Sequence, residues 1–354
     1  MVDKLGRIQE IVEKLGDEES KCIFNARIQY AIKRDETEFL NDIFSLYKEY
    51  RINEFESFIS NLKNGDKKNI VIFGAGYDGK KTWEILKRSK YRDRVIAFAD
   101  NNIGLIGKQV DSLNVLSPDD LLNKEYIVLI ATAKYVNQIY EQLLRYDIPR
   151  ESIFYPRMRK IYAENGWQYF DTIKPKENEV FIDAGCYNGS TSIQFSKWCH
   201  ENYEMIYAFE PDKLCKQRCI ENFKKNNLKK VQFIEKGTYS EDGIISFLGG
   251  GMSYSKLIAD KQIGNCVAVT SIDNVLKGKK ATFIKLDVEG SELETLKGAK
   301  ETIIKYKPRL AISVYHKPED IIELPFYILG LVNDYKLYLR HYTASVNETI
   351  LYAE

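Results

Sequence analysis

Apolar residues recur at helical spacing through the first part of the chain. Leu5, Ile8, Val12 and Leu15 form one stripe among charged residues, and residues 39–62 continue in the same style. Spacings of three and four residues place such side chains on one face of a helix. The pattern predicts a helical N-terminal segment, residues 1–66, which covers the domain that follows it or a partner subunit.

After residue 68 the pattern changes to short apolar runs that alternate with amphipathic stretches. The runs have the length of strands, and the stretches between them have the spacing of helices. We therefore predict a small Rossmann-like α/β domain, residues 67–156, of about one mononucleotide-binding half. Its strands are expected at residues 71–73, 95–100, 127–132 and 153–156.

A second alternation begins at residue 179, after a bridge over residues 157–176 in which Trp167, Tyr169 and Phe170 are the expected anchors. Five strand–helix units and a C-terminal hairpin would complete an α/β sheet. We predict a second domain, residues 157–354. Its strands are expected at residues 180–184, 205–210, 231–235, 282–287 and 310–316, and the hairpin at 335–342 and 348–354.

Each domain opens on a glycine-rich turn between a strand and a helix. In the first domain Gly74, Gly76 and Gly79 have the G-x-G-x-x-G spacing, and Asp100 stands 21 positions after Gly79. This spacing is typical of a turn that holds a dinucleotide pyrophosphate, with an acid for the ribose. A second nucleotide site and a tight turn without a ligand are both open interpretations.

The second turn, FIDAGCYNGSTS, differs in charge. Asp183 stands two positions before Gly185, and Glu210 stands 21 positions after Gly189. A carboxylate here repels a pyrophosphate and favours a ligand that carries an ammonium group. S-adenosylmethionine (SAM) has this profile, because it combines an adenosine with a sulfonium and an amino-acid tail and has no phosphate.

Four further motifs follow this turn: YAFEPD, SIDNVL, FIKLDVEGSELETLKGAKETI and ISVYH. Together with FIDAGCYNGSTS they resemble the FkbM-type family of SAM-dependent methyltransferases, over about residues 175–354. The resemblance implies the class I methyltransferase fold and O-methylation, often of sugars or other small hydroxylated molecules. In the first domain FGAGYDGKK, AFADNN and IVLIAT resemble the small nucleotide-binding-like domains of bacterial glycan-assembly enzymes, which points to polysaccharide biosynthesis in a bacterium.

The resemblance also implies roles for individual residues. It assigns the glycine turn to the methionine end of SAM, Glu210 to the ribose, and Asp287 to the surroundings of the methyl group. Residues 236–243 depart from the family's pattern where adenine contacts are expected. The residues expected to bind SAM are Asp183, Gly185, Cys186, Tyr187, Asn188, Gly189, Ser190, Thr191, Glu210, Pro211 and Asp287.

Methyl transfer to a hydroxyl benefits from a base near the acceptor. Lys285 and Asp287 point to one side of a predicted strand, Glu289 lies just beyond it, and His316 ends the next strand. Neighbouring parallel strands bring their carboxyl ends together, where α/β sheets bind ligands. We expect these four residues to be catalytic, with His316 titrating near neutral pH. A structural ion pair between Lys285 and Asp287 is the alternative.

A divalent metal between Asp287, Glu289 and His316 is a further alternative that the sequence does not favour. Metal-dependent catechol-type methyltransferases use an additional Asp-Asn pair after the next strand, where this chain has a His-Lys pair. Glu292 and Glu294 open the next helix, where acids suit the helix dipole, and Glu294 is expected only to be solvated. No metal ligand is therefore assigned.

The cysteines indicate neither a zinc site nor disulfides. The chain has no C-x-x-C pair and only three histidines, whereas structural zinc sites are usually built from such pairs. Buried thiols in a reduced compartment are the expectation. The six residues are Cys22, Cys186, Cys199, Cys215, Cys219 and Cys266.

The charge balance bears on which classes of partner the protein can bind. The chain has 354 residues, with 52 Lys and Arg against 51 Asp and Glu and a formal net charge of +1, which argues against a nucleic-acid-binding surface. The N-terminus is too charged for a signal peptide and no apolar run reaches the length of a membrane span, so we expect a cytoplasmic protein. Residues 247–256, with three consecutive glycines, would form a lid or acceptor-binding loop, or a hairpin tip.

The sequence thus predicts a SAM-dependent O-methyltransferase that acts on a hydroxyl of a sugar, nucleotide-sugar or glycan precursor. One alternative is an NAD(P)-dependent oxidoreductase that uses residues 74–79, although that domain lacks a second mononucleotide half. Another is a methyltransferase whose N-terminal half is only a sensor or docking module. A nucleotide-type ligand in the first domain and a homo-oligomer are further expectations.

Overall fold

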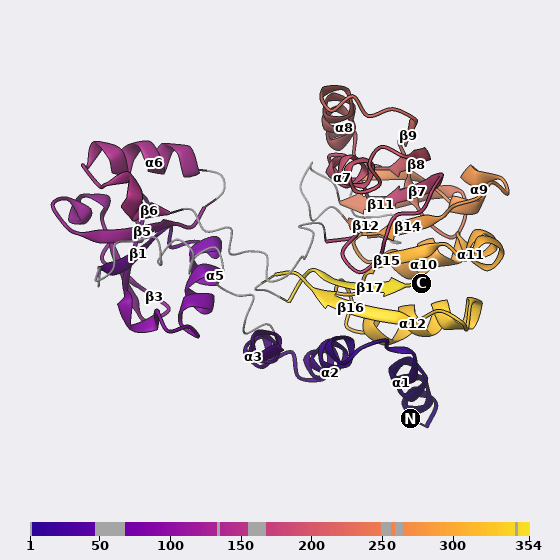
Figure 1. Ribbon diagram of the computed structural model, residues 1–354, viewed down its shortest axis with the longest axis horizontal. Coiled ribbons are helices and arrows are strands. Elements are labelled where there is room, and N and C mark those ends of the chain that lie inside the picture. The colour runs from indigo at the N-terminus through magenta and orange to yellow at the C-terminus, as the bar shows by residue number, and fades with distance from the viewer. Residues whose placement is uncertain are drawn as a thin grey trace. The chain divides into compact units, whose positions relative to one another are not determined.

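The computed structural model describes residues 2–46, 68–132, 135–154, 168–248, 256–258, 265–343 and 346–354. The chain divides into two compact units (Figure 1). The larger consists of residues 1–46, 163–341 and 346–354, and the smaller of residues 47–162 and 342–345. The N-terminal helices therefore belong to the same unit as the C-terminal sheet. Trp167 and residues 249–255 of the expected loop lie outside the described residues.

A seven-stranded sheet forms the centre of the larger unit, in the order β16-β17-β15-β14-β7-β8-β9. Neighbours from β15 to β9 run parallel, and β17 is antiparallel to both β15 and β16. The order reverses at β7, which lies between β8 and β14, so a ligand crevice is expected at the carboxyl ends of β7 and β14. The strands are β7 (Glu179–Ala184), β8 (Tyr203–Phe209), β9 (Val231–Ile234), β14 (Phe283–Leu286), β15 (Arg309–Ser313), β16 (Leu337–His341) and β17 (Thr349–Ala353).

The central strands read as continuous apolar runs because helices cover them, as in other parallel sheets. Aromatic side chains dominate this core: the rings of Phe181 and Phe195 stack with centroids 4.2 Å apart, and Phe283 and Phe170 pack around them. The helices are α7 (Ser190–Trp198), α8 (Lys213–Lys225), α9 (Ile272–Leu276), α10 (Glu292–Lys297), α11 (Lys300–Tyr306) and α12 (Asp320–Leu331).

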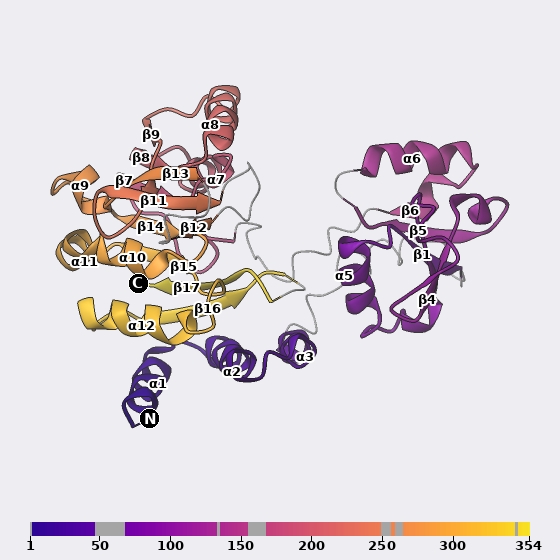
Figure 2. The same cartoon turned by 180° about the vertical axis from the view of Figure 1, so that it is seen from behind.

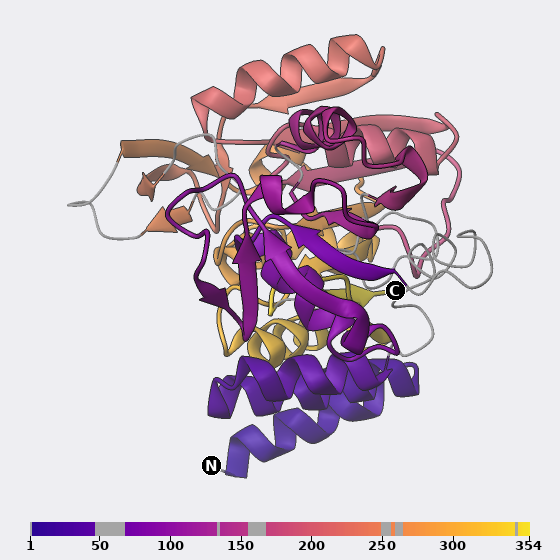
Figure 3. The same cartoon turned by 90° about the vertical axis from the view of Figure 1, so that its left-hand side faces the viewer.

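Three N-terminal helices, α1 (Val2–Lys14), α2 (Glu18–Lys33) and α3 (Glu36–Leu46), belong to this unit. They lie beside β16 and α12 in all three views (Figures 2 and 3). The N–H of Gly16 donates to Leu337, and Ser20 accepts from the N–H of Leu339 at 2.9 Å, so the segment satisfies the edge strand. Of the two roles expected for these helices, covering the domain that follows them in the chain was wrong, because α1 contacts α12 and α2 contacts β16. Covering a partner subunit stays a prediction.

A second, four-stranded sheet in the larger unit was not predicted. Its order is β10-β13-β11-β12, and most of its pairs are antiparallel. The pattern of residues 236–270 includes glycines and polar residues that hid the short strands. They are β10 (Gly237–Thr238), β11 (Gly243–Leu248), β12 (Lys256–Ile258) and β13 (Asn265–Thr270).

The smaller unit has its own six-stranded sheet, in the order β3-β4-β2-β1-β5-β6. Strand β1 lies between β2 and β5 and is parallel to both, so this sheet also reverses its order at the strand that precedes its glycine turn. The α/β architecture that the sequence predicts is present. The elements are β1 (Asn69–Phe73), α5 (Tyr77–Leu86), β2 (Val95–Ala99), β3 (Gln109–Val110), β4 (Leu113–Leu116), β5 (Tyr126–Ile130), α6 (Val136–Arg145) and β6 (Ile153–Phe154), with short 3₁₀ turns at Arg92–Arg94, Pro118–Leu121 and Arg150–Ser152.

All six cysteines are free thiols. Four are buried as expected, but Cys22 and Cys266 are exposed. Within the described ranges, no helix combines the length and the apolar character that crossing a bilayer requires.

The contact between α2 and β16 depends on Asp17. Its carboxylate accepts the N–H of Ser20 at the start of α2 and pairs with Arg340 of β16 at 2.7 Å. Because an N-cap contributes about 0.5–2 kcal/mol, we expect Asp17→Ala to lower the free energy of unfolding by about 1–2 kcal/mol in calorimetry. Asp42→Ala, at an exposed position of α3, is the control and should change it little. Equal effects of the two changes would contradict this role.

Candidate functional site

A cavity of about 190 Å³ lies where the carboxyl ends of β7, β8 and β14 meet. This is the point at which the order of the sheet reverses, as general rules for open α/β sheets predict. Small-molecule pockets usually measure about 300–1,000 Å³. The volume of this cavity lies below that range.

Two glycines shape the turn between β7 and α7. Gly185 has φ +75°, and a Cβ there would lie 1.9 Å from the carbonyl oxygen of Asp287. Gly189 has φ +78°, and its Cβ would lie 2.4 Å from the ring of Phe223. Both positions require glycine, because their positive φ strains other residues and because a Cβ would clash with its neighbour. Tyr187 between them adopts φ 51° despite its side chain, a strain of the kind that collects at ligand sites.

A buried ion pair joins β7 to β14 beneath this turn. The ammonium of Lys285 lies 3.2 Å from Asp183 Oδ1 and donates to the carbonyl oxygens of Ala184 and Gly185 at 3.2 and 2.7 Å. Ser192 donates to the other oxygen of Asp183. Burial alone would lower the pKa of Lys285, but Asp183 and Asp287 outweigh it and raise the pKa above its usual value. Lys285 therefore stays charged, and its partner is Asp183 instead of Asp287.

Glu210 closes one end of the cavity. One carboxylate oxygen accepts the N–H of Tyr187 in the turn at 3.0 Å, and the other accepts the N–H of Asp212 at 2.9 Å. Burial raises the pKa of Glu210 to about 7, against these hydrogen bonds, which favour the ionised form. A carboxylate has about four lone-pair sites, so two remain for hydroxyl groups of a ligand.

Asp287 lies at the other end, after β14. Tyr169 donates its hydroxyl to Asp287 Oδ2 at 2.7 Å, and the Tyr169 ring faces the Lys285 ammonium at 5.2 Å from its centroid. Burial would raise the pKa of Asp287, but Lys285 and His316 hold it below its usual value. Asp287 is therefore an ionised group beside a buried cation.

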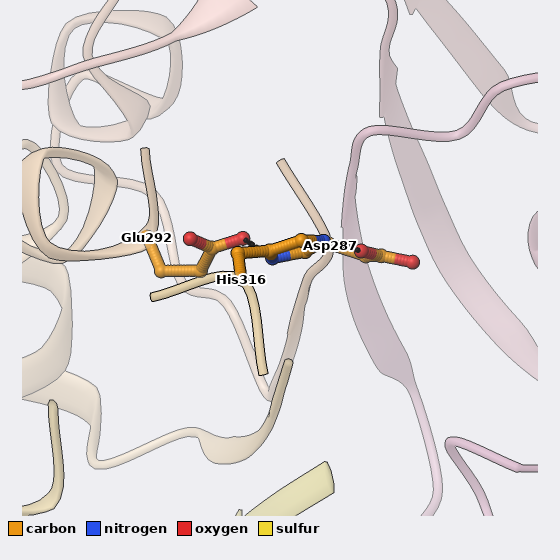
Figure 4. A group of neighbouring side chains, drawn as sticks. All are labelled: Asp287, Glu292 and His316. Atoms are coloured by element: carbon orange, nitrogen blue, oxygen red, sulfur yellow. Dashed lines mark ion pairs between the residues drawn. The ribbon is translucent and has the colours of Figure 1, made fainter. Parts of the chain in front are cut away.

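His316 lies between carboxylates, as Figure 4 shows for Glu292 and Asp287. Its Nδ1 is 2.8 Å from Glu292 Oε1, and its Nε2 is 3.5 Å from Asp287 Oδ1 and 3.4 Å from Glu289 Oε2. Burial opposes the charge of the imidazole, but these acids raise the pKa of His316 to about 9. His316 is thus an imidazolium at neutral pH, and the expectation that it titrates near neutrality was wrong because the sequence did not show three acids around it.

Glu289 lines the cavity next to Asp287. Its backbone has φ 54°, a left-handed conformation that is unusual for a residue with a side chain. Burial raises the pKa of Glu289 to about 7, although His316 acts in the opposite direction. This carboxylate can therefore exchange a proton near neutral pH.

Asp287, Glu292 and His316 each offer a metal-ligand atom within 4.8 Å of one another. However, the two ring nitrogens of His316 face different carboxylates (Figure 4). Glu292 is also held in place, because it accepts the N–H groups of Val288 and Gly290. His316 is thus the cation between these acids, and Asp287 and Glu292 both have it as a partner in the absence of a metal ion.

Most of the residues that the sequence singles out meet at this cavity, but four do not line it: Asp183, Asn188, Gly189 and His316. Asp183 and His316 lie behind the residues that do. The sequence reasoning missed Tyr169 as a site residue, and it missed the contact of Glu292 with His316; neither has a local signal, because each contact joins distant segments. The predicted residues that line the cavity are Gly185, Cys186, Tyr187, Ser190, Thr191, Glu210, Pro211, Lys285, Asp287 and Glu289, and the additional ones are Tyr169, Phe209, Cys215, Gly237, Thr238 and Val288.

The glycine turn of the smaller unit borders a separate cavity. Gly74, Gly76 and Asp100 line it, whereas Gly79 packs against the turn, where a Cβ would lie 1.7 Å from the carbonyl oxygen of Gly74. The third glycine thus has the close-packing role that its place in the motif predicts.

Comparison with known proteins agrees with this architecture. The family described as methyltransferase FkbM domain matches residues 183–342, and the family described as C2185-like, N-terminal, matches residues 66–154. None of the curated protein sequences matches this chain.

Several solved structures are similar. The methyltransferase FkbM of Methylobacillus flagellatus is 19% identical over 89% of this chain and 99% of its own, with a TM-score of 0.49. An rRNA methylase of Streptococcus thermophilus is 13% identical over 50% of this chain and 86% of its own, with a TM-score of 0.34. The fibrillarin of Aeropyrum pernix, in complex with SAM, is 11% identical over 51% of this chain and 67% of its own, with a TM-score of 0.32.

The family match confirms the class I methyltransferase fold that the motifs predict, and with it SAM as the cofactor. It covers the glycine turn, Glu210, the strand that carries Lys285 and the segment that carries His316. Residues 183–342 of this chain therefore belong to the methyltransferase FkbM domain family.

Proposed function

We propose that this protein is a SAM-dependent O-methyltransferase that transfers a methyl group to a hydroxyl of a sugar, nucleotide-sugar or glycan precursor. One observation carries the proposal: the cavity of the methyltransferase domain has a ribose-type acid, Glu210, at one end and an acid with a pKa of about 7, Glu289, at the other. The first suits an adenosine, and the second suits a hydroxyl that must lose a proton.

The donor set of the cavity fits SAM. Glu210 has acceptor capacity left for a ribose diol, and Gly237 and Thr238 line the cavity in the region where adenine contacts are expected. The ammonium of Lys285 is already committed to two carbonyl oxygens and Asp183. Among the described lining residues no other cation is available to pair with a phosphate, which agrees with a nucleoside ligand that has none.

Bound SAM supplies an electrophilic methyl carbon on a sulfonium. The protein's part is to align a hydroxyl with it, exclude water and accept the proton that the hydroxyl loses. We assign the last task to Glu289, because it lines the cavity and its pKa of about 7 leaves it substantially ionised at neutral pH. In this arrangement Glu289 would take up the proton that the hydroxyl loses when it receives the methyl group of SAM, which would leave as SAH.

The other predicted catalytic residues take positioning roles in this account. Lys285 holds the turn of β7 through its carbonyl contacts, and Asp183 keeps Lys285 charged. Asp287 orients Tyr169. His316, as an imidazolium, balances the acids around Glu289. The sugar acceptor itself rests on the family resemblance of the motifs and on the need of a hydroxyl for a base.

Binding of S-adenosylhomocysteine (SAH) should depend on the ionisation of Glu210. Because the ionised carboxylate accepts ribose hydroxyls, affinity should rise with pH to a plateau above about 7 and fall by up to about tenfold per pH unit below it. In calorimetric titrations, Glu210→Gln should bind SAH more weakly and with a flat pH profile. Glu204→Gln, at an exposed position of β8, the strand that Glu210 follows, is the control. If Glu210→Gln keeps the pH dependence of SAH affinity seen in the wild type, Glu210 is not the acceptor of the ribose hydroxyls.

Removal of the base should affect turnover and leave cofactor binding intact. We expect Glu289→Gln to slow methyl transfer from labelled SAM into a pool of glycan precursors by about 10²–10⁴-fold, the usual range for general base catalysis. The rise of the rate through pH 7 should vanish, while SAH affinity changes little. Glu294→Gln, on the same segment but paired with Lys297, should keep the rate. Full activity of Glu289→Gln would exclude it as the base.

If His316 supplies the positive charge among these acids, no metal ion is needed. We therefore expect Mg²⁺ or Mn²⁺ to leave the melting temperature of the wild-type protein unchanged, because a ligand stabilises only what it binds. Differential scanning fluorimetry of the wild type and His316→Asn would measure this. A rise in the melting temperature that is lost in His316→Asn would show a metal site instead.

A further inference from the structure

The smaller unit contains a cavity of about 640 Å³ that the methyltransferase activity does not use. It lies at the carboxyl ends of β1, β2 and β5, where the order of this second sheet reverses. Its volume falls in the range of small-molecule pockets, about 300–1,000 Å³, and this point of an open α/β sheet is where ligands bind. The cavity thus has the place and the size of a ligand site.

Asp100 in this cavity is held in the same way as Glu210 in the methyltransferase domain. Asp100 Oδ2 accepts the N–H of Ala75 in the glycine turn at 2.7 Å, and Oδ1 accepts the N–H of Asn102 at 2.8 Å. Glu210 likewise accepts one N–H from its glycine turn and one from the residue two positions after it. Each acid follows the second strand of its sheet and keeps about two lone-pair sites for a ligand.

Gly76 is a glycine that the fold itself does not require. Its φ is −79°, an ordinary value, and a Cβ there would meet no heavy atom within 4 Å. Gly79, by contrast, has no room for a Cβ. Gly76 lines the cavity at the start of α5, so a side chain at this position would take up space at the cavity wall.

The remaining wall suits hydroxyl groups. Four of its polar members can both donate and accept hydrogen bonds, and a second carboxylate, Asp78, can accept them. Two tyrosines there, Tyr77 and Tyr135, are exposed and offer ring faces for stacking. The polar members that the argument uses are Asn101, Asn102, Thr132 and Gln138.

We propose that this cavity is a second nucleoside-binding site, in which Asp100 accepts the two hydroxyls of a ribose and Gly76 leaves room for the 5′ substituent. The ligand is a ribonucleoside or its phosphate; the shared chemistry is the vicinal diol. The inference rests on the proposed role of Glu210, because it transfers that role to Asp100 through their matching hydrogen bonds.

The test is calorimetric titration of the full chain saturated with SAH, which occupies the methyltransferase cavity. The probes are the four ribonucleosides, ADP, GDP, CDP, UDP and NAD, each compared with its 2′,3′-dideoxy form where one exists. We expect at least one probe to bind with a stoichiometry of one and its dideoxy form to bind at least tenfold more weakly. Nucleosides and nucleotides in separate titrations distinguish the two sources of the diol.

Variants make the assignment specific. Asp100→Ala and Gly76→Val should abolish probe binding and leave SAH affinity unchanged, and Gly76→Val should keep the wild-type melting temperature. Asp93→Asn, at an exposed position outside the cavity, should bind as the wild type does. The proposal is overturned if no probe binds, if the dideoxy form binds equally well, or if Gly76→Val keeps full affinity. If the wild-type protein does not bind SAH, that result contradicts the proposed function and not the second site.

Discussion

The buried ion pair of Asp183 and Lys285 joins β7 and β14, the two central strands of the methyltransferase domain, at positions that are partners in their register. The Lys285 ammonium also donates to the carbonyl oxygens of Ala184 and Gly185. One cation therefore binds both Asp183 and the glycine turn. The rest of the site follows, because Gly185 then passes against the carbonyl of Asp287 with no room for a side chain. Loss of one partner would leave a buried charge uncompensated, which typically costs about 3–5 kcal/mol.

Charge is distributed around the cavity in a way that separates binding from chemistry. Glu210 and Glu289 are both carboxylates whose pKa burial raises to about 7, but they face different neighbours. Glu210 is held by backbone amides and keeps acceptor capacity for hydroxyls. Glu289 faces the imidazolium of His316, which shares its charge among three acids. Similar residues thus acquire the roles of ribose acceptor and base from their surroundings.

Sequence patterns predicted the parts of this molecule that depend on local spacing. The strands of the seven-stranded sheet, strands β1, β2, β5 and β6, the two glycine turns and the acids that follow β2 and β8 lie close to where periodicity and motif placed them, whereas β3, β4 and the four-stranded sheet were not predicted. Contacts between distant segments could not be read in this way. Tyr169 meets Asp287, and Glu292 meets His316, only because the fold joins separate elements. For the same reason the helical spacing of α1–α3 indicated a buried face but not that β16 and α12 would cover it.

The central claim is that the cavity between β7 and β14 binds the methyl donor with its ribose on Glu210. A crystal structure of the full chain with SAH tests it most directly. The account predicts both ribose hydroxyls within hydrogen-bond distance of the Glu210 carboxylate, adenine beside Gly237 and Thr238, and the sulfur toward Asp287 and Glu289. A ribose held away from Glu210, or SAH bound at Asp100 in the smaller unit alone, would contradict it.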